Sequence, residues 1–277
     1  MQSLEILIAT MFRTDFSFLE EIFSKNKHFS NYNILIVNQT NEDKLLHSDY
    51  DNIRVINSYE RGSPASRNLA IRNAKHDICL MADDDIVYEE GFDTTILKAY
   101  EAQPQASFIS FEAVNEHGGL YANYPSRGKH TKSSLRTIYT IVISFKRELF
   151  KEHQVYFNHF FGVGSLFKGE TEIMFLRNAF DKGLPMYHEN KTIVMHADDS
   201  SGRHLGSDEA FYARSAAACR FYGNLSYIWL LKYTLFTLRK GYITIGEFIS
   251  KMKIGMQGIS KYKSLARSGE IDKIHGD

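Results

Sequence analysis

Residues 61–86 read RGSPASRNLAIRNAKHDICLMADDDI, which places a helix, a strand and three consecutive aspartates in close succession. Ser63 is suited to cap the predicted helix, and Pro64 suits its first turn. The apolar run Ile78–Ala82 is typical of a buried strand, and Asp83–Asp85 follow it directly. Ligands of parallel α/β sheets bind at the carboxyl ends of the strands. This position therefore favours a functional role for the aspartates.

The aspartate triplet by itself admits two interpretations. Three adjacent carboxylates repel one another, so a fold that gathers them usually supplies a cation or leaves them fully solvated. Aspartate-rich turns are also common before helices, and the triplet precedes a helix predicted to start near Gly91. The residues alone leave a divalent-metal site and a solvated acidic turn equally open.

Short apolar runs alternate with helical patterns through the first half of the chain. This alternation predicts an α/β fold with a mostly parallel sheet flanked by helices. The predicted strands and helices are Glu5–Ala9, Ser17–Lys25, Asn33–Val37, Ile53–Ile56, Pro64–Ala74, Ile78–Met81, Phe92–Ala102 and Phe108–Phe111.

The second half begins with a polar segment, Asn115–Ser134, that is predicted to be a long mobile loop. Beyond it the patterns predict two strands and a helix, followed from Ser207 onward by helices only. These elements are Ile138–Phe145, Glu170–Phe180, Thr192–Met195, Ala210–Tyr222, Tyr227–Leu238 and Ile245–Ile259. We therefore expect a C-terminal helical extension after the sheet.

The composition excludes several classes of protein. The 277 residues are 43% apolar and include only two cysteines, so neither a disulfide framework nor a cysteine zinc site is expected. The N-terminus lacks a basic region before its apolar stretch, and no uncharged run is long enough to span a membrane. We expect a cytoplasmic protein. Residues 224–277 contain nine Lys and Arg against four Asp and Glu, without the clustering of a nucleic-acid site.

The segment Tyr227–Phe236 is apolar almost all round, and Lys232, Arg239 and Lys240 lie in it or just after it. It is interpreted either as a helix packed on the domain or as an interfacial helix with basic ends. In the second case the protein rests peripherally on the inner face of an anionic membrane that holds a lipid-linked substrate.

Three further clusters of residues are suited to binding or catalysis. Arg61–Asn68 joins a turn, a helix start and two arginines, a combination that favours phosphate. Gly169–Glu172 opens a helix, so its glutamates suit either the helix dipole or a general base. His196 follows a strand and precedes Asp198 and Asp199. Imidazole and carboxylate are ligands of manganese-like ions, although a lone histidine is more often a packing residue.

The order of these clusters resembles glycosyltransferase family 2. The match comprises a glycine, a spacer, Ser66-Arg67-Asn68, an apolar helix, a strand and then the aspartates in the position of the D-x-D motif. The strand segments Ile8–Met11 and Ile34–Gln39 look like the two nucleotide-binding strands of bacterial capsule and surface-polysaccharide members. The resemblance covers residues 4–205.

The resemblance implies a GT-A (Rossmann-like) fold that transfers a sugar from a nucleotide-sugar with inversion. It divides the chain into a glycosyltransferase domain, residues 1–205, with a nucleotide-binding half 1–113 and an acceptor half 114–205, and a helical extension, residues 206–277. It places Thr10, Asn38, Arg67, Asp83 and Asp84 at the nucleotide. Many members have Asp where this chain has Asn38.

The resemblance also implies a cofactor and a catalytic base. Mn²⁺ or Mg²⁺ would be held by Asp85 or Asp84, with His196 as a further ligand. Glu172 falls at the position of the base, where the family usually has Asp, and Glu170 is the alternative. The expected donor is a UDP-sugar, and the expected acceptor is a hydroxyl of a glycan or lipid-linked molecule in bacterial surface-polysaccharide synthesis.

Two other classes remain as alternatives. A sugar nucleotidyltransferase also combines a parallel sheet with metal-binding aspartates, but it usually begins with a glycine-rich loop, which Ala9–Arg13 lacks. A catalytically inactive nucleotide-sugar or carbohydrate-binding protein would keep the same fold. Donor turnover with and without EDTA distinguishes the enzyme from the binding protein.

Overall fold

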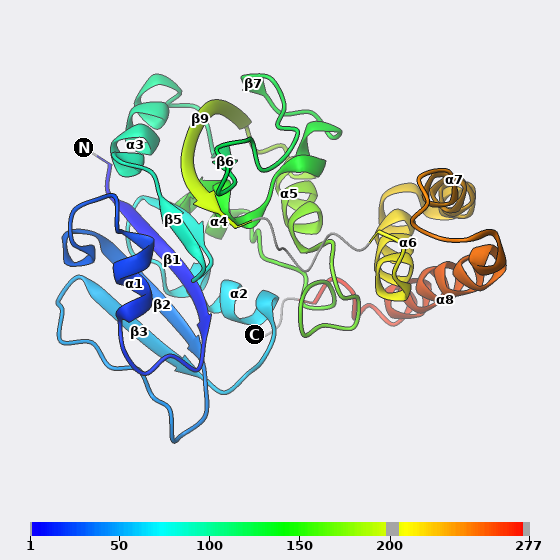
Figure 1. The fold of residues 1–277 in the computed structure, drawn as a ribbon, viewed down its shortest axis with the longest axis horizontal. Helices are drawn as coiled ribbons and strands as arrows, with labels where there is room; N and C mark the ends of the chain where they lie inside the picture. The colour runs from blue at the N-terminus through cyan, green and yellow to red at the C-terminus, as the bar shows by residue number, and fades with distance from the viewer. Residues whose placement is uncertain (1, 198–204, 274–277) are drawn as a thin grey trace. The chain divides into compact units, whose positions relative to one another are not determined.

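The computed structural model of the chain describes residues 2–197 and 205–273. Over these residues it forms a mixed nine-stranded sheet with the order β3-β2-β1-β4-β8-β6-β9-β5, and the short β7 pairs with β9. The predicted α/β class is confirmed. Figure 1 shows the first three strands side by side in blue.

The first strands are parallel and lie at one side of the sheet, where β1 (Leu4–Met11) pairs with both β2 (Asn33–Gln39) and β4 (Ile78–Ala82). β3 (Ile53–Ser58) extends the sheet from β2. β1, β2 and β4 are buried along nearly their whole length, as expected for strands with neighbours on both sides and cover on both faces.

The remaining strands mix directions. β8 (Ile143–Lys146) runs antiparallel between β4 and β6 (Phe108–Val114), and β6 runs parallel to β9 (Met186–His196). β5 (Ile86–Tyr88) pairs antiparallel with the end of β9. These strands form short pairings with their neighbours, and the periodicity of the sequence does not predict such short pairings.

Helices connect these strands. Their bounds in the sheet-bearing part of the chain are α1 (Ser17–Ile22), α2 (Ser63–Asn73), α3 (Phe92–Ala102), α4 (Arg147–Glu152) and α5 (Thr171–Asp181). Short 3-10 turns occupy Phe29–Asn31, Ser134–Thr137 and Thr140–Val142.

Several predicted boundaries differ from the observed ones. Ser63 is the first residue of α2 and does not precede it as a cap. Residues 140–142 form a 3-10 turn, so the predicted strand Ile138–Phe145 is strand only from Ile143. The polar segment from Asn115 contains the two-residue strand β7 (Gly128–Lys129), which pairs with β9 and gives this loop a fixed register.

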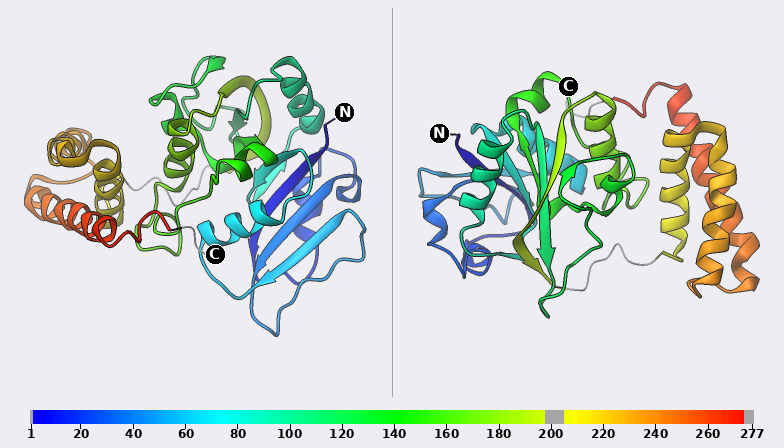
Figure 2. Two further views of the ribbon diagram at one scale, coloured as in Figure 1. Left: turned by 180° about the vertical axis from the view of Figure 1, so that it is seen from behind. Right: turned by 90° about the horizontal axis from the view of Figure 1, so that it is seen from above.

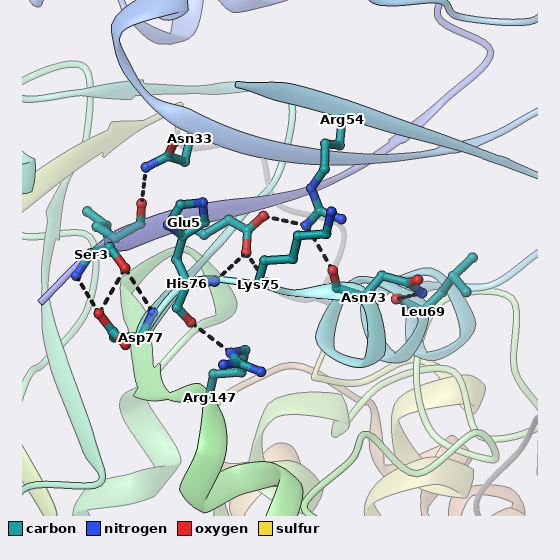
Figure 3. Close-up of polar contacts among 11 residues, drawn as sticks. Ser3, Glu5, Asn33, Arg54, Leu69, Asn73, Lys75, His76, Asp77 and Arg147 are labelled. Carbon is teal, nitrogen blue, oxygen red and sulfur yellow. Dashed lines mark hydrogen bonds and ion pairs between the residues drawn. The ribbon is translucent and has the colours of Figure 1, made fainter. Parts of the chain in front are cut away.

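The amino end of the sheet is held by a buried carboxylate. Glu5 on β1 is 1% exposed, accepts hydrogen bonds from the backbone N–H groups of Lys75 and His76 at 2.6 and 3.2 Å, and forms an ion pair of 2.5 Å with Arg54 (Figure 3). Asp77 accepts two hydrogen bonds of 2.8 Å from Ser3. These contacts tie β1, β3 and the segment between α2 and β4 together at the edge opposite the aspartates.

The C-terminal part consists of α6 (Asp208–Tyr222), α7 (Ser226–Arg239) and α8 (Phe248–Arg267), with 3-10 turns at Gly223–Leu225 and Ile245–Glu247. Figure 2 shows the three helices packed side by side. Ser207 caps α6 by accepting a hydrogen bond from the Ala210 N–H, and Asp208 and Glu209 complement the dipole in its first turn. The predicted helical extension is confirmed.

The chain divides into two compact units. The first comprises Met1–Arg61, Ala65–Tyr156 and Phe175–Asp199, and the second comprises Gly62–Pro64, Phe157–Met174 and Ser200–Asp277. Residues 157–174 therefore group with the C-terminal helices, and Phe161, Phe167 and Phe211 share their core. The domain boundary at residue 205 stays a prediction.

Candidate active site

Polar side chains stand in a row at the carboxyl edge of the parallel strands in the first unit. Thr10 on β1 is in register with Asn38 on β2, and Asn38 is in register with Asn57 on β3. Asp83 and Asp84 follow β4, which lies on the other side of β1. The chain thus gathers Thr10, Asn38 and the aspartates at one edge, as the order of its strands predicts.

Asp84 is held by the end of β1. Its Oδ2 accepts a hydrogen bond from the Thr10 hydroxyl and two more from the Arg13 guanidinium, at 3.0 Å from Nε and 2.9 Å from Nη2. Such charge-assisted bonds fix the carboxylate in one orientation. Arg13 has no role in the sequence-based prediction, although it lies only two residues beyond β1.

Asp83 has a different partner. Its Oδ1 lies 2.9 Å from Nη2 of Arg67 on α2, and the Arg67 side chain is only 9% exposed. A guanidinium that is this deeply buried needs a carboxylate or phosphate to compensate its desolvation. The structure thus brings together the arginine and the aspartate that the sequence places at the nucleotide.

Asp85 faces His196. His196 is the last residue of β9 and pairs in register with Ile86, the residue after Asp85, so the sheet itself brings the two side chains together. Asp85 Oδ1 lies 3.4 Å from His196 Nε2, and the Asp85 side chain is two-thirds exposed. The hydrogen bond with His196 lowers the pKa of Asp85, and the same hydrogen bond raises the pKa of His196.

The hydrogen bond made by Nδ1 of His196 determines whether Nε2 is able to bind a cation. Nδ1 lies 2.6 Å from the backbone carbonyl of Ala197, and because a carbonyl only accepts, Nδ1 carries the proton. The hydrogen bond from Nε2 to Asp85 therefore belongs to the protonated ring, whereas in the neutral ring Nε2 has a free lone pair that can bind a cation. A backbone carbonyl that orients the ring in this way is the usual second partner of a metal-binding histidine.

The residues present fit a divalent cation in part. Asp85 offers an exposed carboxylate oxygen and His196, whose side chain is 11% exposed, offers a ring nitrogen, while Asp83 and Asp84 are paired with arginines. Over residues 2–197 and 205–273, no group of three or more His, Cys, Asp and Glu side chains forms a complete metal site. Asp198 and Asp199, which the sequence places beside His196, lie outside the described residues. Mg²⁺ usually takes its remaining ligands from water and substrate phosphates.

Asn38 lies beneath this surface. Its side chain is completely buried, accepts a hydrogen bond from the Arg13 N–H and donates to the Arg13 carbonyl and to Asn57. Asn57 in turn holds both backbone groups of Leu46. The amide of Asn38 therefore fixes the backbone of the segment after β1 that carries Arg13.

Phe12 adds an aromatic surface beside the row. It adopts a left-handed backbone conformation with φ of 58° and is 41% exposed. The Arg61 guanidinium lies 4.5 Å from the centre of its ring, and Lys44 Nζ lies 5.5 Å from it. A cation-flanked ring suits a base and phosphates. The signal in the sequence was the aromatic residue directly after a strand at the ligand edge.

The two candidate bases lie in the second unit. Glu170 has φ of 59°, accepts the Met174 N–H at its carbonyl and forms an ion pair of 3.1 Å with Nε of Arg214. Glu172 lies in the first turn of α5 and is half-buried. Glu170 thus has a clear structural role at the start of α5, where its carboxylate is already matched by a guanidinium.

Comparison with known proteins decides the family. The profile of Glycosyl transferase family 2 matches residues 6–173, which is more than half of the chain and includes the three aspartates and both glutamates. The chain belongs to glycosyltransferase family 2. It is accordingly a glycosyltransferase that transfers sugar from a nucleotide-sugar. No curated protein matches the sequence significantly.

Solved structures show the fold of this family 2 glycosyltransferase. S. aureus TarS 1–349 is 11% identical with a TM-score of 0.59, and the match covers 99% of this chain and 95% of that one. TarS 1–349 in complex with UDP-GlcNAc is 13% identical with a TM-score of 0.58 over 99% and 95% of the two chains. A longer TarS chain, 12% identical with a TM-score of 0.59, is covered over 53% of its length and covers 98% of this one. The GT-A fold expected from the sequence is confirmed.

Proposed function

We propose that this enzyme is a metal-dependent, inverting hexosyltransferase that moves a sugar from a UDP-sugar to a hydroxyl of a glycan or lipid-linked acceptor in bacterial surface-polysaccharide synthesis. The observation that supports a nucleotide-sugar donor site is that the three adjacent aspartates have different partners. Asp83 and Asp84 are paired with Arg67 and Arg13, whereas the exposed carboxylate of Asp85 faces the largely buried ring of His196. The likeness in fold to TarS bound to UDP-GlcNAc supports UDP as the carrier.

The chain's own residues bind and orient the donor. Phe12, Arg13 and Arg61 present an aromatic face and two guanidiniums for the base and the phosphates. Asp85 and His196 Nε2 would hold Mn²⁺ or Mg²⁺. A divalent cation bound there supplies the charge that stabilises the diphosphate as a leaving group.

The acceptor hydroxyl needs a base that takes its proton. Glu172 is the stronger candidate, because it falls at the position of the base in the family, whereas the carboxylate of Glu170 forms an ion pair with Arg214. Attack on the anomeric carbon from the face opposite the leaving group inverts its configuration in one displacement, without a covalent enzyme intermediate.

The metal assignment is tested by UDP release from a panel of UDP-sugars, with an acceptor mixture and with Mn²⁺ or EDTA. EDTA should abolish turnover by the wild type, and Asp85→Asn should reduce it at least about a hundredfold. Asp49→Asn, at an exposed aspartate outside the row, serves as the matched control. Turnover that is insensitive to EDTA would refute the metal dependence, and absence of any turnover across the panel would favour a binding protein.

The base assignment is tested by substituting each glutamate separately. Glu172→Gln should keep donor binding and lower transfer about 10²- to 10⁴-fold, the usual contribution of a general base. Glu170→Gln should reduce thermal stability more than transfer, since it weakens the pair with Arg214. If Glu172→Gln transfers sugar at a near-normal rate while Glu170→Gln does not, the two roles are reversed.

A further inference from the structure

Helix α7 shows an inverted distribution of side chains. Its outward stripe contains Ile228, Leu231 and Leu235, which are 54%, 44% and 50% exposed. The spacing of three and four residues places them along one face of the helix. Phe236 and Leu225 are exposed beside this stripe. An ordinary surface helix presents polar residues at these positions.

The inward side of α7 is comparatively polar. Ser226, Thr234 and Thr237 are completely buried there, together with Leu230 and Tyr233. Thr234 and Thr237 donate hydrogen bonds of 2.9 Å to the helix's own carbonyls, at Leu230 and Thr234 respectively. Because the two threonine hydroxyls are satisfied within the helix, α7 can face the core of the second unit with small polar groups and still leave its large apolar residues outside.

The charged residues of the segment that contains α7 all have one sign. Residues 226–246 contain no aspartate or glutamate, while Lys232, Arg239 and Lys240 are exposed. By helical spacing Lys232 and Arg239 lie at the edge of the apolar stripe. Long basic side chains at the border of an apolar face reach outward to anionic head groups while their stems cover apolar surface.

These features favour a lipid surface over a second copy of the chain. A symmetric contact through α7 would place the basic residues Lys232 and Arg239 of one copy against the same segment of the other, which contains no acidic residue. An anionic bilayer offers both an apolar layer and negative charge. α7 has 14 residues, and among residues 2–197 and 205–273 no helix is long and apolar enough to cross a membrane, so contact along the surface is the remaining geometry.

We infer that α7 docks this enzyme onto an anionic phospholipid membrane, with Ile228, Leu231 and Leu235 inserted at the head-group boundary and Lys232, Arg239 and Lys240 contacting the head groups. The inference is independent of the catalytic residues. Vesicle binding needs neither donor nor acceptor, so its failure is distinguishable from failure of the proposed reaction.

The first test is flotation of the full-length protein with vesicles of phosphatidylcholine alone or mixed with phosphatidylglycerol. The wild type should float with the anionic vesicles only, and high salt should weaken binding. The variant Lys232→Gln/Arg239→Gln/Lys240→Gln should lose about fivefold in affinity for each charge removed. Lys98→Gln/Lys151→Gln, exposed lysines of the first unit, should bind like the wild type.

The second test replaces the apolar stripe. Ile228→Ser/Leu231→Ser/Leu235→Ser should lose at least about tenfold in affinity and keep the wild-type thermal unfolding temperature, since the three side chains are half exposed in the free protein. Leu120→Ser, another exposed apolar residue, is the control. If the wild type is a dimer that this variant converts to monomer, and vesicles do not bind, the surface is a contact between copies and the proposal is overturned.

A third measurement needs no substitution. Trp229 is the only tryptophan of the chain, lies on α7 and stacks on Tyr233 with ring centres 5.0 Å apart. Its fluorescence should be quenched by vesicles that contain brominated anionic lipid and unchanged by brominated phosphatidylcholine alone. Unchanged emission in both cases would contradict docking through α7, even if the protein binds vesicles by another surface.

Discussion

Three adjacent aspartates have three different partners in this molecule. Asp83 pairs with Arg67, Asp84 pairs with Arg13 and Thr10, and Asp85 faces His196. Neighbouring residues after a strand point in different directions, so each carboxylate meets a different element. The sequence indicated that the aspartates act together with Arg67 and His196, but their partners depend on where the fold places β1, α2 and β9.

Glu5 provides a prediction at the residue scale. Glu5→Ala should lower the free energy of unfolding by about 3–5 kcal/mol, because it leaves Arg54 and two backbone N–H groups without their carboxylate. Glu5→Gln should cost less, since it keeps an acceptor oxygen. Denaturant unfolding measures both, with Glu20→Ala, an exposed glutamate, as the control. A loss below about 1 kcal/mol, typical of exposed pairs, would contradict this account.

Buried histidines provide a second prediction. The Ser110 hydroxyl lies 2.8 Å from His130 Nε2 and 2.8 Å from His188 Nδ1. Burial lowers the pKa of His130 to about 3, with a further contribution from His188, and burial also lowers the pKa of His188. Both rings therefore stay neutral in the folded protein at pH values where the unfolded chain binds protons.

The lowered pKa values of the two histidines in the folded protein determine how its stability changes with pH. The stability from the neutral rings is complete above pH ~6.5, the ordinary histidine pKa, and declines as the pH falls towards the folded value. Each histidine contributes a slope of up to about 1.4 kcal/mol per pH unit. Unfolding measured between pH ~6.5 and ~5, above the range of most carboxylates, should show this slope, and His130→Gln should reduce it. His28→Gln, an exposed histidine, should leave it unchanged.

At the scale of elements, long periodic segments were the most predictable. α3 was predicted with its observed bounds, and α6 and α7 within two residues. β5 and α4 were missed, and the strand that contains β8 was predicted to start too early, because elements of three to six residues owe their existence to their neighbours. β5 is one such case, and its pairing with β9 is what brings His196 to Asp85.

The turn before α2 is set by close packing in the second unit. The Ser63 N–H donates to the Val163 carbonyl at 2.9 Å. Gly162 has φ of 135°, and a Cβ there would lie 2.3 Å from the Thr171 hydroxyl and 2.7 Å from the Ser63 hydroxyl. The start of α2 and the segment before α5 are thus joined where only glycine fits.

Gly162→Ala should therefore destabilise the protein by about 1–3 kcal/mol beyond the cost of its backbone conformation. Gly169→Ala is the matched control, because Gly169 has nearly the same φ, 133°, with nothing within 4 Å of an added Cβ. Thermal unfolding of the two variants separates the effect of crowding from that of strain. Equal losses in both would show that packing at Gly162 is unimportant.

At the scale of the whole molecule, binding of a ligand at the proposed donor site should raise the stability of the protein. A ligand that binds only the folded state raises the free energy of unfolding, by about 2.7 kcal/mol at a hundredfold excess over its Kd. UDP with Mn²⁺ should therefore raise the unfolding temperature more than UDP with EDTA. Asp85→Asn should keep the increase from UDP and lose the increment from Mn²⁺, whereas uridine and Mn²⁺ should leave the wild type nearly unchanged.

The sequence by itself determined the α/β class, the C-terminal helices, the family and most of the residues at the donor edge. These follow from local patterns: apolar periodicity, and the spacing of Arg67, the aspartates, Glu172 and His196. Tertiary structure decided which carboxylate meets which partner, the buried role of Asn38 and the outward apolar face of α7. The physical reason is that strand register and helix rotation are fixed by packing between distant segments, which no local pattern encodes.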